Sequence, residues 1–146
     1  MKHFISLTII TLYLIIHSTT SFSHEGASGI IKERMDKFQE SKSIMRLINK
    51  SFANKDFTII ENGASKLQKW GLDMNNFFPE GSNKKPSEAR EEIWLEPDLF
   101  KLAIENFTKA SANLLKISKE KNLEKTIQAF REVANTCKGC HKKFRN

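Results

Sequence analysis

Hydrophobic residues recur at helical spacing in four stretches of this chain, and no stretch shows the alternation of a strand. In each stretch the apolar side chains return to one side at intervals of three, four or seven residues. The last stretch is typical, with Phe130, Cys137, His141 and Phe144 on one stripe. The pattern predicts helices over about residues 29–50, 56–70, 97–119 and 123–144.

The segment between the second and third predicted helices, residues 72–96, has a different composition. It holds Pro79, Gly81 and Pro86, which favour turns, so we expect mainly loop, and Gly71 is a natural stop for the helix before it. Its aromatic residues indicate a loop held against the core: Phe77, Phe78 and Trp94. The sequence therefore predicts an all-α fold, an antiparallel four-helix bundle with a long crossover between helices 2 and 3.

Residues 1–23 have the layout of a secretory signal peptide. A positive start at Lys2 precedes an apolar run over 4–16 and a polar stretch that ends at Ser23, where cleavage is expected. An uncleaved membrane anchor is the alternative, although the run is shorter than the roughly 20 residues that a bilayer requires. We expect one mature domain over residues 24–146, exported to the periplasm.

The mature domain is basic. Loss of residues 1–23 leaves 23 basic against 17 acidic residues, a net charge of +6. Such a surface suits an acidic partner or an anionic membrane. Nucleic acid is not an expected partner, because the protein is exported and no basic motif is interleaved with aromatic residues.

The chemistry of the chain is concentrated at Cys137-Lys138-Gly139-Cys140-His141. The two cysteines are three residues apart, so they share one side of a helical turn and staple almost nothing as a disulfide. Cys-x-x-Cys-His is specific for c-type haem attachment, in which each thiol adds to one haem vinyl group and the histidine ligates the iron. We therefore expect one covalent haem c.

Three other interpretations of the cysteine pair are weaker. A zinc site needs two more ligands, and His24 is the only other histidine of the mature chain. A thioredoxin-like pair belongs beside a βαβ pattern, which the sequence lacks. A plain disulfide leaves His141 unexplained.

The attachment motif lies on the last predicted helix, and the mature chain resembles the class II c-type cytochromes, the cytochrome c-prime (c') family. The resemblance is carried by Ile31-Lys32-Glu33-Arg34-Met35, by Glu92-Ile93-Trp94 and by residues 137–145. It implies that Arg34 pairs with a haem propionate, for which a guanidinium fork is suited. It leaves open whether Arg145 reaches the second propionate or stays in solvent.

The resemblance also implies that Phe38 faces the iron on the side opposite His141. Low-spin relatives have a methionine at this position, whereas a phenyl ring has no lone pair to donate. The expected iron is therefore five-coordinate and high-spin, in an apolar distal pocket. Met35 and Met45 are the rival sixth ligands.

Two functions follow as expectations. A vacant sixth position favours the binding of small gases such as nitric oxide and carbon monoxide. Electron transfer is the second function, because an exposed haem edge ringed by basic residues would dock acidic redox partner proteins: Lys138, Lys142, Lys143 and Arg145. The two roles can coexist, and a methionine-ligated, low-spin iron would make electron transfer the main one. An enzyme is not expected, because no distal His and Arg pair is evident. A homodimer is expected by analogy with relatives.

Overall fold

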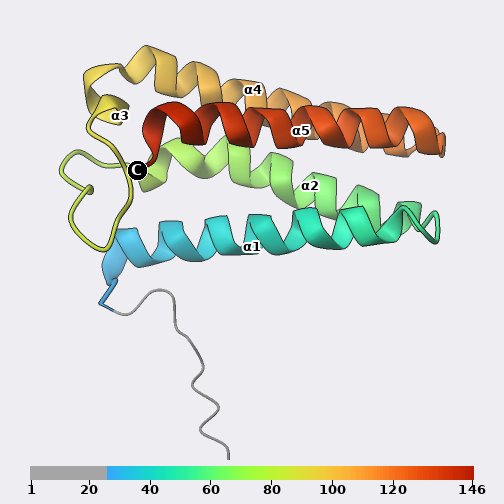
Figure 1. Cartoon of the computed structure of the whole chain (residues 1–146), viewed down its shortest axis with the longest axis horizontal. Helices are drawn as coiled ribbons and strands as arrows, with labels where there is room; N and C mark the ends of the chain where they lie inside the picture. The colour runs from blue at the N-terminus through green and yellow to red at the C-terminus, as the bar shows by residue number, and fades with distance from the viewer. Residues whose placement is uncertain (1–25) are drawn as a thin grey trace, which may run out of the picture.

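The computed structural model describes residues 26–146, so the predicted signal peptide lies outside the described residues. Four long helices lie side by side, and successive ones run in opposite directions (Figure 1). The predicted antiparallel four-helix bundle is confirmed. A 3₁₀ turn, η2 (Met74–Phe77), and a one-turn helix, α3 (Glu92–Leu95), interrupt the crossover. The long helices are α1 (Gly29–Ser51), α2 (Phe57–Asp73), α4 (Pro97–Ser118) and α5 (Leu123–Phe144).

The four helices do not close on one another evenly. α2 packs along α4, α4 packs along α5, and α1 packs against α2 and η2. Within residues 26–146, the backbones of α1 and α5 make no close approach. Most of the buried core therefore lies among α2, α4 and α5, with Ile48 added by α1, and it includes Ile60, Leu67, Phe107, Leu114 and Val133.

Two glycines of α2 allow its close contacts with other helices. A Cβ on Gly63 would lie 2.8 Å from the side chain of Ile48 of α1, and a Cβ on Gly71 would lie 2.3 Å from Oγ1 of Thr108 of α4. The prediction that Gly71 ends the second helix is wrong, because α2 continues to Asp73. The glycine is present for close approach to α4 rather than as a helix stop.

Local signals set the starts of the helices. The side chain of Asp56 accepts a hydrogen bond from the backbone N–H of Ile59 (3.1 Å), and Asn122 caps α5 in the same way through Lys125 (3.0 Å). Pro97 occupies the first turn of α4, where its missing N–H costs nothing. None of the helices in residues 26–146 combines the length and apolarity of a bilayer span.

The crossover is held to the bundle by the aromatic residues that the sequence indicated. The ring of Phe78 lies 4.8 Å from that of Phe100, and Phe77 lies 5.1 Å from Trp70. Trp94 donates from Nε1 to the carbonyl oxygen of Phe78 (3.1 Å). These contacts fix the crossover across one end of the gap between α1 and α5 (Figure 1).

Candidate functional site

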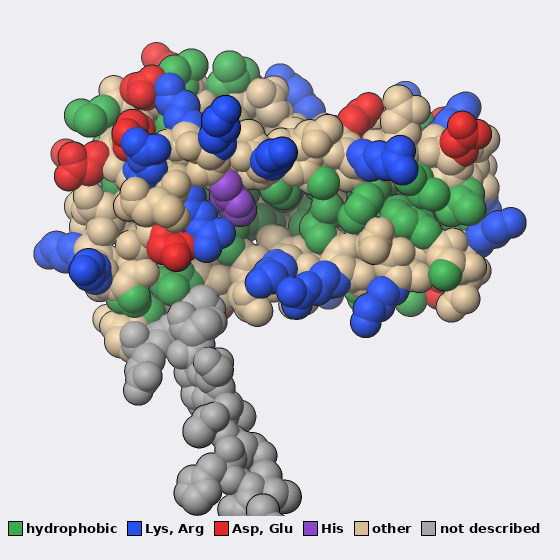
Figure 2. All heavy atoms as spheres, in the orientation of Figure 1, with side chains coloured by type: hydrophobic (Ala, Val, Ile, Leu, Met, Phe, Trp, Pro, Cys, Tyr) green, Lys and Arg blue, Asp and Glu red, His purple; other side chains and the backbone are tan. Residues whose placement is uncertain are grey.

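An open cavity of about 720 Å³ occupies the gap between α1 and α5. That volume lies within the range of cofactor and ligand pockets, roughly 300–1,000 Å³. Its walls are mainly apolar and aromatic, including Met45, Phe78, Phe100, Phe107 and Phe130. Figure 2 shows this apolar lining as a groove between two edges that carry basic side chains, with a histidine at its left-hand end.

The predicted attachment residues line this cavity. α5 buries one face in the core through Thr126, Ala129 and Val133. Its adjacent face, which carries Cys137, Cys140 and His141, opens into the cavity. The apolar stripe predicted for this helix is therefore the wall of a pocket rather than a packed core surface.

Both cysteines are free, half-buried thiols. Burial raises the pKa of the Cys140 thiol to about 11, with a smaller contribution from neighbouring Cys137. Burial also raises the pKa of Cys137. At neutral pH the pair is therefore uncharged, as suits sulfurs that face an apolar cavity.

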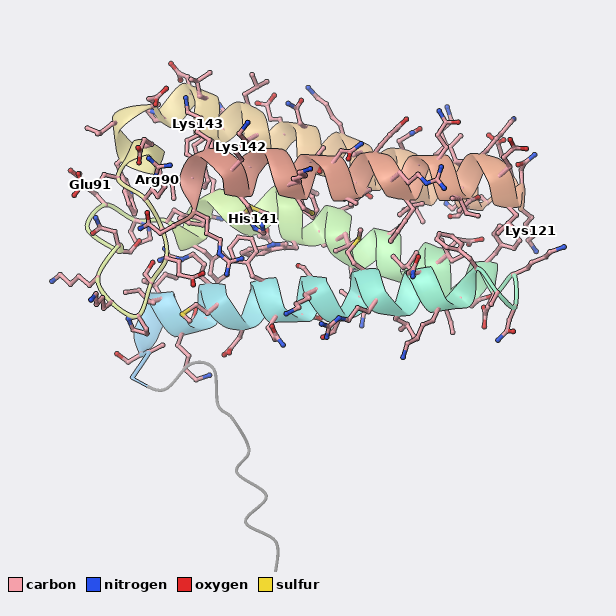
Figure 3. The ribbon with its side chains drawn as sticks, viewed as in Figure 1. Arg90, Glu91, Lys121, His141, Lys142 and Lys143 are labelled. Carbon is pink, nitrogen blue, oxygen red and sulfur yellow. The ribbon has the colours of Figure 1, made fainter. Side chains whose placement is uncertain are left out.

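His141 lies between α5 and α1 (Figure 3) and is open to solvent through the cavity. Partial burial lowers the pKa of His141, the positive charge of Arg145 lowers it further, and Glu88 opposes both. The imidazole is therefore neutral at pH 7, which is the form that ligates metal ions.

Phe38 of α1 stands opposite His141. The two ring centroids are 6.2 Å apart, with an angle of 67° between the ring planes. Phe38 is itself held by edge-on contacts to Trp70 (5.4 Å) and Phe78 (6.3 Å), which restrict its movement. An aromatic ring without a donor atom therefore faces the histidine.

Arg34 is buried, with only 2% of its surface exposed, and anchors the crossover. Nη1 donates to the carbonyl oxygen of Phe77 (2.9 Å) and to Oγ of Ser82 (2.8 Å). Nη2 donates to the carbonyl oxygen of Ser82 (2.6 Å) and to Oγ of Ser87 (2.8 Å). The guanidinium also lies 4.4 Å from the ring centre of Phe78.

No acidic side chain of residues 26–146 pairs with Arg34. Burial lowers the pKa of its guanidinium, but the group stays charged at every physiological pH. The four Nη hydrogens are donated to the crossover, so the Nε–H of this buried cation is what remains to meet an anionic group of a cofactor bound in the cavity.

Arg145 lies at the same end of the cavity and is already paired. Its Nε donates to Oε2 of Glu88 (2.6 Å), and the surrounding backbone is joined by an isolated bridge between Ala89 and Arg145. The N–H of Arg90 donates to the carbonyl oxygen of Phe144 (3.1 Å). These bonds join the C-terminal end of α5 to the crossover. The side chain of Arg145 itself is half-exposed at the edge of the cavity.

The other candidates divide between cavity and surface. Met35 and Met45 both line the cavity. Lys143 forms an ion pair with Glu96 (2.6 Å), whereas Lys142 forms none in the described part of the chain. Residues 26–146 contain no cluster of three or more His, Cys, Asp or Glu side chains suited to a metal ion.

Lys42 and Arg46 line the cavity without having been predicted. A spacing signal was present, because both continue the four-residue series that begins with Arg34 and Phe38. The crossover partners of Arg34 had no such signal, since Ser82 and Ser87 lie about 50 residues away.

The residues at the cavity fit a haem. The cavity is large enough for a cofactor, its walls are mainly apolar, and it is lined by two thiols and a histidine. Cys137 and Cys140 would hold the haem and His141 would ligate its iron. Phe38 is in edge-on contact with His141, with ring centroids 6.2 Å apart.

A four-helix bundle that opens between its first and last helices, with a Cys-x-x-Cys-His motif facing the opening, defines the class II cytochrome type. The family model described as cytochrome C' matches residues 29–145. The chain belongs to the cytochrome c' family, whose members bind haem.

Solved structures agree on the fold. Cytochrome c' from Rubrivivax gelatinosus is 22% identical, with a TM-score of 0.72 over 80% of this chain and 94% of that one. A cytochrome c' with ligand-controlled dimer dissociation is 19% identical, with a TM-score of 0.75 over 80% and 93%. A nitric oxide complex of a variant from Alcaligenes xylosoxidans is 22% identical, with a TM-score of 0.71 over 80% and 94%. No curated protein matches the sequence significantly.

Proposed function

We propose that this chain is an exported c-type cytochrome that carries one haem, attached covalently through Cys137 and Cys140 and ligated by His141. Membership of a haem-binding family supports the cofactor. The location of all three residues on the cavity wall supports their roles. The periplasmic location rests on the sequence of residues 1–23 alone.

The primary function we propose is the binding of small diatomic gases, nitric oxide and carbon monoxide. The bound haem supplies the iron to which a gas coordinates. The observation that carries the proposal is the ring of Phe38, 6.2 Å from that of His141, where a coordinating side chain would otherwise stand. The nitric oxide complex of a structural neighbour adds support.

The chain's own residues decide what reaches the distal side. Phe38 and Phe78 line the cavity beside buried Trp70, and neither phenyl ring has an atom that can form a conventional hydrogen bond with water. A neutral diatomic molecule loses little by entering such a pocket, whereas water loses its hydrogen bonds. Because no distal acid–base pair accompanies these rings, we propose a binding protein rather than an enzyme.

The alternative function is electron transfer with a methionine as sixth ligand. Met35 and Met45 support it, because both line the cavity. Each faces an obstacle: Met35 is one residue from Arg34, about 100° around α1, and Met45 lies about 10 Å along the axis from Phe38. We also propose a homodimer as the resting assembly, by analogy with a dimeric neighbour.

Covalent attachment is tested by denaturing electrophoresis with a haem stain, on protein matured in a host able to attach c-type haem. The band of the wild-type protein should stain. Cys137→Ser combined with Cys140→Ser should abolish the staining, and Ser43→Ala, on the exposed surface of α1, is the matched control. Haem that leaves the wild-type chain under acid–acetone extraction would contradict covalent attachment.

A further inference from the structure

Unpaired basic side chains gather along both edges of the cavity opening. We define the mouth cations as Lys42 and Arg46 of α1, together with Arg131, Lys138 and Lys142 of α5. All five are exposed, and none forms an ion pair within residues 26–146. Figure 2 shows basic side chains above and below the apolar groove.

Helical geometry places these residues on one side of the gap. Counting about 100° per residue, Lys42 and Arg46 lie roughly 40° and 80° around α1 from Phe38. The α5 members lie roughly 60–100° around that helix from His141, in the same rotational sense. The two helices are antiparallel and face each other. A rotation in the same sense about each helix axis therefore points the cations of α1 and those of α5 to the same side, which is the open mouth of the cavity.

Acidic residues are sparse at this mouth. The acids of α1 lie within about 40° of the side opposite Phe38: Glu33, Asp36 and Glu40. On α5, Glu132 lies opposite His141, whereas Glu124 lies on the mouth side but about 10 Å beyond Arg131 along the helix axis. Among the described residues that line the cavity, Glu88 is the only acid, and Arg145 neutralises it. The mouth therefore carries a local excess of positive charge. The net charge of +6 says only that the domain is basic and does not give this location.

We propose that the mouth cations form a docking surface for an acidic electron-transfer protein, which exchanges one electron with the iron without making or breaking a bond. This inference rests on the proposed haem site, and it adds a partner to it. The α5 cations extend over about 16 Å, from Arg131 to Lys142. Because these cations flank the opening of the cavity that the haem would fill, an acidic redox protein docked on them would lie next to the haem edge.

The test measures binding rather than activity. Oxidised flavodoxin, an acidic redox protein, is titrated calorimetrically into the haem-loaded cytochrome at about 0.01 M and about 0.15 M salt, where the Debye length is roughly 30 Å and 8 Å. The test variant is Lys42→Glu with Arg46→Glu. The control, Lys69→Glu with Lys116→Glu, makes the same change of net charge on exposed positions of α2 and α4.

The expected result is a loss of affinity of about tenfold for the mouth variant at low salt, and of less than about threefold for the control. Higher salt should weaken wild-type binding and shrink the difference. Arg131→Glu, on α5 and outside the attachment motif, should reproduce the loss in part. It also provides a second arm if the double variant is poorly folded.

Three outcomes would overturn the docking surface. The first is no binding of flavodoxin to the wild type, and the second is an equal loss of flavodoxin affinity in the mouth and control variants. The third is that the wild type binds anionic phosphatidylglycerol vesicles more tightly than flavodoxin and that only the mouth variant loses this binding. The last would assign the surface to a membrane. Failure of the haem proposal is distinguishable, because it would appear as an absent carbon monoxide difference spectrum in the wild type.

Discussion

Arg34 provides the sharpest test of how the crossover is held over the cavity. Arg34→Met keeps a long side chain and removes every donor. The buried guanidinium donates four hydrogen bonds, two of them to the carbonyl oxygens of Phe77 and Ser82. Each buried carbonyl left without its donor costs about 1–3 kcal/mol. The two together cost roughly 2–6 kcal/mol, and relief of the buried charge offsets part of that cost.

We therefore expect Arg34→Met to lower the free energy of unfolding by about 2–4 kcal/mol, a large part of a typical 5–15 kcal/mol. Denaturant unfolding of the haem-loaded protein, followed by helix dichroism, measures this difference, and limited proteolysis should cut the crossover first. Arg46→Met is the control, since Arg46 is exposed on the same helix and should change stability by less than about 0.5 kcal/mol. A loss below about 1 kcal/mol with unchanged proteolysis would refute the anchoring of the crossover by Arg34.

Three further predictions concern the distal pocket, helix packing and export. Phe38→Met should shift the ferric optical spectrum towards low spin and weaken carbon monoxide binding. Phe38→Ala should speed gas entry, measured by flash photolysis. Unchanged spectra and rates in both variants would show that Phe38 does not lie beside the iron. Gly71→Ala should lower the free energy of unfolding by about 1–3 kcal/mol in thermal unfolding, because the new Cβ would lie 2.3 Å from Oγ1 of Thr108. The control Gly139→Ala, with open space around it, should be neutral or stabilising. Equal effects of the two substitutions would show that α2 and α4 approach less closely. Intact-mass analysis of the exported protein should place its N-terminus near His24, and a chain that retains Met1 would favour the membrane anchor.

The sequence predicted the helices well where periodicity coincided with local signals. The last helix begins and ends at Leu123 and Phe144 as predicted, because Asn122 caps it and the apolar stripe is uninterrupted. Periodicity alone was less precise on the third helix. A helical apolar stripe can be drawn from Leu99 or from Phe100; in the structure Leu99 is 46% exposed, whereas Phe100 is 4% exposed and belongs to the core. Two adjacent apolar residues left the orientation of that helix undetermined.

The site was only partly accessible to sequence reasoning. Cys137, Cys140 and His141 are contiguous, so their chemistry is visible without a fold. The proximity of Phe38 to His141 depends on how α1 and α5 face each other, and only the family resemblance implied it. The role of Arg34 in holding Ser82 and Ser87 depends on the path of the crossover, which no short-range pattern encodes.

The vacancy of the sixth iron position is the central claim, and the optical spectrum tests it most directly. The haem-loaded protein is recorded in the ferric and ferrous states, with and without carbon monoxide. Because Phe38 offers no donor opposite His141, we predict a high-spin spectrum in both oxidation states and a ferrous protein that binds carbon monoxide without displacing a distal ligand. A ferric spectrum that is already low-spin, with a methionine–iron charge-transfer band, would contradict the account and make Met35 or Met45 the ligand.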